Sequence, residues 1–200
     1  MRIVTRADFD GIICATLLQE ALETTEPIFW VEPGDMQKGL VTIQEGDILA
    51  NLPYDERCAM WFDHHYTNRP DTPFEGSFEI APSAAGVVFR YYRDRFGRDY
   101  TELVRQTDKI DSADLTPDEV IHPENYPYIL LSMTISGRRK EDESYWNRLI
   151  RLLGKYDMSR VIEDAEIRER CQTVTEQNIR YRKFLKNHTR LEKHVSDSVP

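Results

Sequence analysis

Apolar residues in the first 110 positions fall into short runs separated by longer segments of helical periodicity. The short runs predict strands at residues 2–5, 27–31, 47–50 and 59–62. The helical spacing predicts helices at residues 11–23, 83–92 and 100–110, and Ser83 after a proline is a suitable cap for the second of them. Strands that alternate with helices are typical of a parallel β-sheet flanked by helices, so we expect an α/β fold.

The strand pattern fades after about residue 115. Thr116 and Pro117 are typical of a helix start, as cap and first-turn residue. Residues 128–135 are apolar and fit either a helix or a strand. Two further helices are expected, at residues 142–155 and 159–194. We therefore expect an α/β domain at residues 1–135 and a helical extension at 136–200, whose long charged helix fits a linker or the contact of a homodimer.

Composition and charge narrow the class of protein. Of the 200 residues, 40% are hydrophobic, which is enough for a packed core. Residues 1–136 carry 11 basic and 24 acidic side chains, whereas residues 137–200 carry 15 basic and 11 acidic ones. An acidic body suits a metal site and a basic arm suits anion contact, although two differently composed solvated surfaces give the same balance. The three cysteines form no Cys-x-x-Cys pair, which argues against a thiolate zinc site.

The sequence favours a cytoplasmic protein. None of its apolar runs approaches the length that spans a membrane, and the N-terminus lacks the pattern of a signal peptide.

A first acidic cluster follows the first predicted strand. Asp8 and Asp10 would point the same way in an extended segment, and Gly11 would allow a sharp turn into the next helix. Ligands of parallel α/β sheets collect at this end of the strands. The same residues also fit a helix N-terminus made acidic to match its dipole.

Two more clusters hold side chains that bind metals. Asp63, His64 and His65 come directly after an apolar run, and carboxylate and imidazole together suit Mn²⁺ or Zn²⁺. Asp108 and Asp111 lie three residues apart and therefore share a helix face. One of these two carboxylates could complete a metal site, and an ordinary charged helix end is the alternative.

Four blocks of sequence occur in order: Asp-Phe-Asp-Gly at 8–11, Asp-His-His at 63–65, Ala-Pro-Ser-Ala-Ala-Gly-Val-Val-Phe-Arg-Tyr-Tyr at 81–92, and Asp-Lys-Ile-Asp-Ser-Ala-Asp at 108–114. Together they resemble the DHH phosphoesterase superfamily, especially its exopolyphosphatase-related branch, over about residues 1–135. The resemblance implies hydrolysis of phosphate esters or phosphoanhydrides with paired Mn²⁺ (or Mg²⁺) ions, which activate water and neutralise phosphoryl charge.

The resemblance also implies roles for single residues. The implied metal ligands are Asp8, Asp10, His64 and either Asp108 or Asp111, with Asp111 favoured. His65 matches a phosphate contact, and Asp63 is expected to orient the two histidines; both are counted as catalytic.

Two positions depart from the pattern of the superfamily. Arg6 stands where a histidine is common, and Asn51 stands where a strand end usually supplies a bridging aspartate. A guanidinium does not bind metals, whereas the amide oxygen of Asn51 is a further candidate metal ligand, weak and neutral. We therefore expect one ion rather than two, with Arg6 as a surrogate cation that binds phosphate and takes part in catalysis. The alternative is that Arg6 pairs with Asp8 or Asp10 in a collapsed site.

The expected ligand is a phosphate-containing small molecule or short oligonucleotide. The Gly-Gly-Gly-His segment of the superfamily's C-terminal substrate domain does not occur, so that domain is expected to be absent. Arg138 and Arg139 could bind phosphate instead, or form a solvated loop. A metal-dependent phosphohydrolase and a catalytically weakened phosphate- or nucleotide-binding regulatory module both fit. The retained acidic and histidine residues favour the enzyme, because clustered carboxylates repel without a cation.

Overall fold

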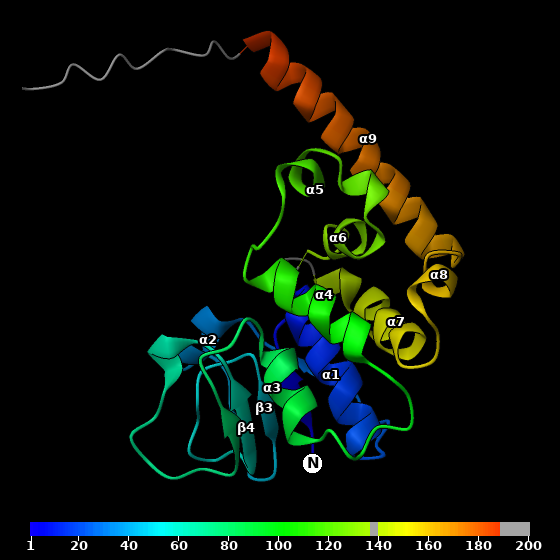
Figure 1. Cartoon of the computed structure of the whole chain (residues 1–200). Coiled ribbons are helices and arrows are strands. Elements are labelled where there is room, and N and C mark those ends of the chain that lie inside the picture. The colour runs from blue at the N-terminus through cyan, green and yellow to red at the C-terminus, as the bar shows by residue number, and fades with distance from the viewer. Residues whose placement is uncertain (137–139, 189–200) are drawn as a thin grey trace, which may run out of the picture.

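The computed structural model describes residues 1–136 and 140–188, and within them a parallel five-stranded sheet is flanked by helices (Figure 1). The strands are β1 (Ile3–Thr5), β2 (Phe29–Trp30), β3 (Ile48–Ala50), β4 (Met60–Asp63) and β5 (Gly76–Phe78). Their order in the sheet is β2-β1-β3-β4-β5, and each neighbouring pair is parallel. The predicted α/β class is confirmed. The sequence analysis missed β5, whose short segment holds a single large apolar residue.

The helices and 3₁₀ turns are α1 (Phe9–Ala21), α2 (Pro33–Gln37), η1 (Tyr66–Asn68), α3 (Ala84–Tyr91), α4 (Thr101–Asp111), α5 (Pro117–Ile121), η2 (Pro123–Asn125), α6 (Pro127–Ser132), η3 (Lys140–Asp142), α7 (Glu143–Leu153), α8 (Met158–Val161) and α9 (Ala165–His188). The apolar segment at 128–135, which fitted a helix or a strand, contains helix α6. The helix predicted over 159–194 is divided into α8 and α9, because Asp164 accepts hydrogen bonds from the first backbone amides of α9. Its last part lies outside the described residues.

The side chains of each strand alternate between two hydrophobic clusters. Ile3, Ile48 and Phe62 face a large cluster formed with α1, α3, α4 and α7. Val4, Leu49 and Trp61 face a smaller cluster closed by loop residues and α2. The helices therefore cover mainly one face of the sheet.

Helix α1 is buried on all sides, which explains why its sequence is apolar around the whole helix. It packs against β1 and against α3, α4 and α7. It begins two residues earlier than predicted, because Asp8 is its N-cap and accepts a hydrogen bond from the amide of Gly11. The extended arrangement considered for Asp8 and Asp10 is therefore wrong, since Asp10 lies in the first helical turn.

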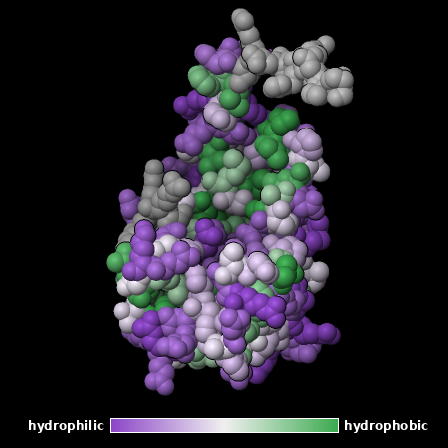
Figure 2. Space-filling model, turned by 90° about the vertical axis from the view of Figure 1, so that its left-hand side faces the viewer, coloured by the Kyte–Doolittle hydropathy of each residue, from purple (hydrophilic) through white to green (hydrophobic). Residues whose placement is uncertain are grey.

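The C-terminal helices share the main core. Residues of α7, α8 and α9, among them Trp146 and Ile167, belong to the same cluster as α1. The predicted division near residue 135 does not coincide with a break in this core. The upper part of the molecule, built by α5, α6 and α9, carries exposed apolar side chains, whereas the sheet-bearing part below is mostly hydrophilic on the face shown in Figure 2. Among the described helices, none combines the length and apolarity needed to cross a membrane.

Glu119 ties α5 to α4. Its carboxylate accepts from the backbone amide of Thr116 in a reciprocal capping box, and it also pairs with the Lys109 ammonium. The Lys109 contact and the capping donors hold the pKa of Glu119 down at about 2. A depressed acid pKa contributes stability that is present above the unfolded value near 4.5 and is lost as the pH falls toward 2.

We expect Glu119→Gln to lower the melting temperature at pH 7 by about 2–4 °C, because the capping acceptor and the ion pair are both weakened. The difference from the unaltered protein should shrink as the pH falls toward 2, where Glu119 itself becomes neutral. Thermal denaturation across this pH range measures the effect, with the exposed Glu45→Gln as matched control. An effect independent of pH would contradict the assignment.

Candidate metal centre

The carboxyl ends of three adjacent strands bring the acidic and histidine clusters together. Asp8 follows β1, Asn51 follows β3, and Asp63 ends β4, and these strands are neighbours in the sheet. Parallel strands end at the same edge, where ligands of such sheets usually bind. The end of α4 adds Asp111 to this edge.

Asp10 is buried and held by the N-terminus of α3. Its Oδ2 accepts from the Ala84 amide at 2.9 Å, and its Oδ1 accepts from the Ala85 amide at 2.8 Å. Ser83 caps the same helix by accepting from the amide of Gly86. The carboxylate of Asp10 is therefore fixed in position by two backbone donors and by the positive end of a helix.

His64 presents a nitrogen to Asp10 and Asp111. Its Nδ1 lies 2.9 Å from the Ala81 carbonyl oxygen, which only accepts, so Nδ1 carries the proton. In the neutral ring, the lone pair of Nε2 then faces the carboxylates, 3.3 Å from Asp111 Oδ2 and 3.8 Å from Asp10 Oδ2. This nitrogen is buried and makes no hydrogen bond to any residue in the described ranges.

The arrangement of Asp10, His64 and Asp111 fits a divalent ion. Their ligand atoms lie within 4.8 Å of one another. Ligands placed about 2.0–2.2 Å from a first-row ion lie roughly 3–4 Å apart, and the distances from His64 Nε2 to the two carboxylates, 3.3 and 3.8 Å, fall in this range. A backbone carbonyl that orients the ring of a histidine is the usual support for a metal-binding imidazole. The orphaned Nε2 is the observation that a cation would explain.

The carboxylates resist ionisation when no cation is present. Burial is the main cause that raises the pKa of Asp10 well above its usual value, followed by the charges of Asp111 and Asp8. Burial likewise raises the pKa of Asp111. A divalent cation between them would remove this repulsion.

Asp8 already has its own partners. Arg6 Nε lies 2.7 Å from Asp8 Oδ2, and Asn51 Nδ2 donates to Asp8 Oδ1 at 3.0 Å. Asn51 adopts a left-handed backbone with a φ of 57°, and its own Oδ1 is buried without a partner in the described part of the chain. The structure thus places the Arg6 guanidinium beside Asp8, while Asp10 faces His64.

Asp63 supports His65. It is fully buried, and its Oδ1 lies 2.8 Å from His65 Nδ1 while its Oδ2 accepts from Asn68 Nδ2 at 2.7 Å. The hydrogen bond to Asp63 raises the pKa of His65 and favours its protonated form. Asp63, His64 and His65 also lie close enough to hold an ion. Their hydrogen bonds already satisfy Asp63, however, so Asp10, His64 and Asp111 form the better-suited group.

The remaining predicted site residues lie elsewhere. Asp108 accepts from the Ser83 hydroxyl and so supports the start of α3 rather than facing His64. Arg138 and Arg139 lie outside the described residues. Sequence reasoning missed Asn68 and the backbone groups of residues 81, 84 and 85. For the backbone groups of residues 84 and 85, the one signal in the sequence was Ser83, which predicted that a helix begins there.

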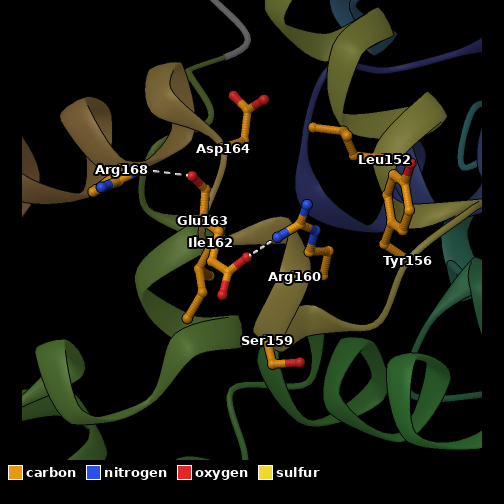
Figure 3. Close-up of a pocket in the computed structure, with 8 residues that line it drawn as sticks. All are labelled: Leu152, Tyr156, Ser159, Arg160, Ile162, Glu163, Asp164 and Arg168. Atoms are coloured by element: carbon orange, nitrogen blue, oxygen red, sulfur yellow. Dashed lines mark hydrogen bonds and ion pairs between the residues drawn. The ribbon is translucent and has the colours of Figure 1, made fainter.

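A cavity of about 830 Å³ lies away from the candidate metal centre, between α7, α8 and the start of α9 (Figure 3). Its cationic side chains are engaged within it, since Arg160 pairs with the Glu163 carboxylate and Arg168 donates to the Glu163 carbonyl at 2.6 Å. None of the candidate metal ligands at the strand ends lines this cavity.

Fold and site together define an α/β protein with a candidate metal centre at the carboxyl ends of its strands. A search of solved structures finds PggH, a pGpG-specific phosphodiesterase from Vibrio cholerae, with a TM-score of 0.83 and 31% sequence identity. The match covers 96% of this chain and 65% of that enzyme, so the chain spans just under two thirds of its length. The two proteins share their fold. No protein-family model and no curated protein matches this chain.

Proposed function

We propose that the chain is a member of the DHH phosphoesterase superfamily and a metal-dependent phosphodiesterase that hydrolyses a short linear oligonucleotide such as pGpG. One observation carries this proposal: the unpartnered Nε2 of His64 lies between the carboxylates of Asp10 and Asp111. The fold shared with a pGpG-specific phosphodiesterase supports it.

Asp10, His64 and Asp111 hold one Mn²⁺ or Mg²⁺ ion in this proposal. When bound, the ion lowers the pKa of water and neutralises charge on the phosphoryl oxygens. Arg6 takes the place of a second cation. Its Nε lies 2.7 Å from Asp8 Oδ2 and its side chain is 36% exposed, so the guanidinium is accessible to a phosphate oxygen.

His65 acts as the proton donor to the leaving group. Asp63 holds Nδ1, which leaves Nε2 on the partly exposed side of the ring for the substrate. The oxygen of water forms a bond to phosphorus, the bond from phosphorus to the leaving nucleoside oxygen breaks, and that oxygen takes a proton from His65. The water gives one proton to solvent, and two nucleoside monophosphates result from pGpG.

Incubation of the chain with pGpG and Mn²⁺, followed by chromatography, tests this proposal. We expect GMP as the product, with no product when a chelator removes the metal. Inorganic polyphosphate serves as the parallel substrate, and release of phosphate from it alone would favour an exopolyphosphatase. Failure to hydrolyse either substrate would contradict the proposed activity.

A weakened regulatory module of the same fold is the second candidate. The ion pair of Arg6 with Asp8 and the amide of Asn51 favour it, since both reduce the number of metal ligands. Such a module would bind pGpG or GMP with Mn²⁺ and leave pGpG intact, so calorimetry beside the hydrolysis assay separates the two functions.

The double substitution Arg6→His and Asn51→Asp should create a second ion site. It replaces a cation and a neutral amide beside Asp8 with an imidazole and a carboxylate, which are metal ligands. We expect two Mn²⁺ ions per chain by atomic emission after dialysis, against one in the unaltered protein. Equal metal content in the two proteins would contradict the role given to Arg6.

Asn51→Asp alone should destabilise the metal-free protein by about 2–8 °C, because it places a second carboxylate against Asp8. Both side chains tolerate the left-handed backbone at this position, so strain does not confuse the result. Thermal denaturation measures the change, and the exposed Asn125→Asp is the matched control.

A further inference from the structure

A cavity of about 560 Å³ lies beside β2, the edge strand of the sheet. We call it the β2 pocket; the lining residues used below are Phe29, Trp30, Glu32, Asp35, Trp146 and Ala7. Neither the resemblance nor the proposed chemistry assigns it a role. The pocket has an aromatic wall and two carboxylates, and it borders the proposed metal centre.

The aromatic wall is firmly packed. Trp146 is 3% exposed, and Trp30 meets it edge to face with ring centroids 5.2 Å apart. Neither indole N–H has an acceptor in the described parts of the chain. Phe29 is 36% exposed at the rim. Trp30 is the residue of this wall that can offer a ring face to a nucleobase, because Trp146 is almost fully buried and the Arg2 guanidinium lies 4.5 Å from the centre of the Phe29 ring.

The charges of the β2 pocket disfavour phosphate. Arg2 lines the pocket, yet its guanidinium is engaged by both oxygens of Asp47 at 2.9 and 2.6 Å. Glu32 and Asp35 carry no ion pair among the described residues, so their carboxylates are free acceptors. A suitable ligand is therefore planar and presents hydrogen-bond donors rather than negative charge.

The pocket borders the proposed metal centre. Ala7 lines it and lies between Arg6 and Asp8 in the chain. Val31, the residue before Glu32, donates its backbone N–H to the carbonyl of Thr5 at the end of β1, which places Glu32 at the same edge of the sheet as Asp8. A base in the β2 pocket would therefore lie next to a phosphate at the strand ends.

We propose that the β2 pocket binds a guanine base of the substrate, stacked on its aromatic wall and paired with the carboxylate of Glu32 or Asp35. This inference rests on the proposed function and names the part of the substrate that the site selects. Guanine presents two adjacent donors, N1–H and the 2-amino group, to one carboxylate. Adenine presents an acceptor at N1 and would leave the carboxylate facing a lone pair, a mismatch that strongly disfavours binding.

Titrations of the full chain with GMP and with AMP, monitored by tryptophan fluorescence, test the assignment. We expect GMP to bind at least tenfold more tightly than AMP. Trp30→Ala should weaken GMP binding about 5- to 150-fold, the usual effect of losing one stacked base. Glu32→Gln and Asp35→Asn together should reduce the preference for GMP at least tenfold, and they leave the fold intact because neither side chain is buried.

Tyr156→Ala is the matched control, since this aromatic residue lines the separate cavity of Figure 3. It should change GMP binding less than twofold. Equal affinities for GMP and AMP, or GMP binding unchanged in the carboxylate variant, would overturn the base site.

Failure of the guanine site and failure of the proposed phosphodiesterase activity give different results. Hydrolysis of pGpG with no effect of the pocket variants would refute the base site and keep the phosphodiesterase. Selective GMP binding that the pocket variants abolish would establish the base site even in a chain that cleaves no pGpG.

Discussion

Replacing His64 by alanine should weaken Mn²⁺ binding more than about 100-fold and abolish hydrolysis of pGpG. The loss of even a supporting partner of a metal ligand costs about 10- to 100-fold in affinity, and in the proposed site His64 supplies the ligand atom itself. Its removal leaves only the two carboxylates of Asp10 and Asp111 in that group. Calorimetry with Mn²⁺ and the hydrolysis assay measure the two effects.

His188→Ala is the control for this experiment, because His188 is an exposed histidine at the end of α9 whose described contacts are with Phe184 of the same helix. It should change neither Mn²⁺ affinity nor rate. The metal-free His64→Ala protein should keep the fold of the parent with lower stability, since the alanine removes a ring that is only 10% exposed. Mn²⁺ binding that survives His64→Ala would contradict the assigned site.

Replacing His65 by alanine should lower kcat about 10²- to 10⁴-fold while Mn²⁺ affinity changes little. This range is typical of the loss of a general acid. His65 Nδ1 is held by Asp63, and His65 does not belong to the group of Asp10, His64 and Asp111, so the ring is not needed for the proposed ion. Steady-state kinetics with pGpG and calorimetry with Mn²⁺ separate the two properties.

Asn68→Ala provides a graded comparison, because it removes one donor to Asp63 and leaves His65 in place. Its kcat should fall much less than that of His65→Ala. A parallel loss of metal and activity in His65→Ala would instead place that histidine among the metal ligands.

Much of the fold could be predicted because the central strands are continuous apolar runs. Helix α1 is apolar around its whole circumference, so its approximate position could be predicted. Its first residue could not, because the cap at Asp8 depends on the hydrogen bond from the Gly11 amide. Strand β5 has a single large apolar side chain and is defined by pairing with β4, which local pattern does not reveal.

The sequence predicted which types of residue form the site, but not which of these residues contact one another. Asp10 and Asp111 are 101 positions apart in sequence, and only the packing of α4 against α1 brings them to His64. Asp108 looked equivalent to Asp111, but it faces the hydroxyl of Ser83. Two roles were open for Arg6 from the sequence, and in the structure it pairs with Asp8. Whether it also binds phosphate stays a prediction.

Anomalous scattering from a crystal of the full chain loaded with Mn²⁺ tests the central proposal most directly. It locates each ion and its ligands without depending on any substrate. We predict a single strong peak bounded by Asp10, His64 and Asp111, with Arg6 still beside Asp8. A peak beside Asp8, two peaks of equal height, or no peak at His64 would contradict the proposed single-ion site.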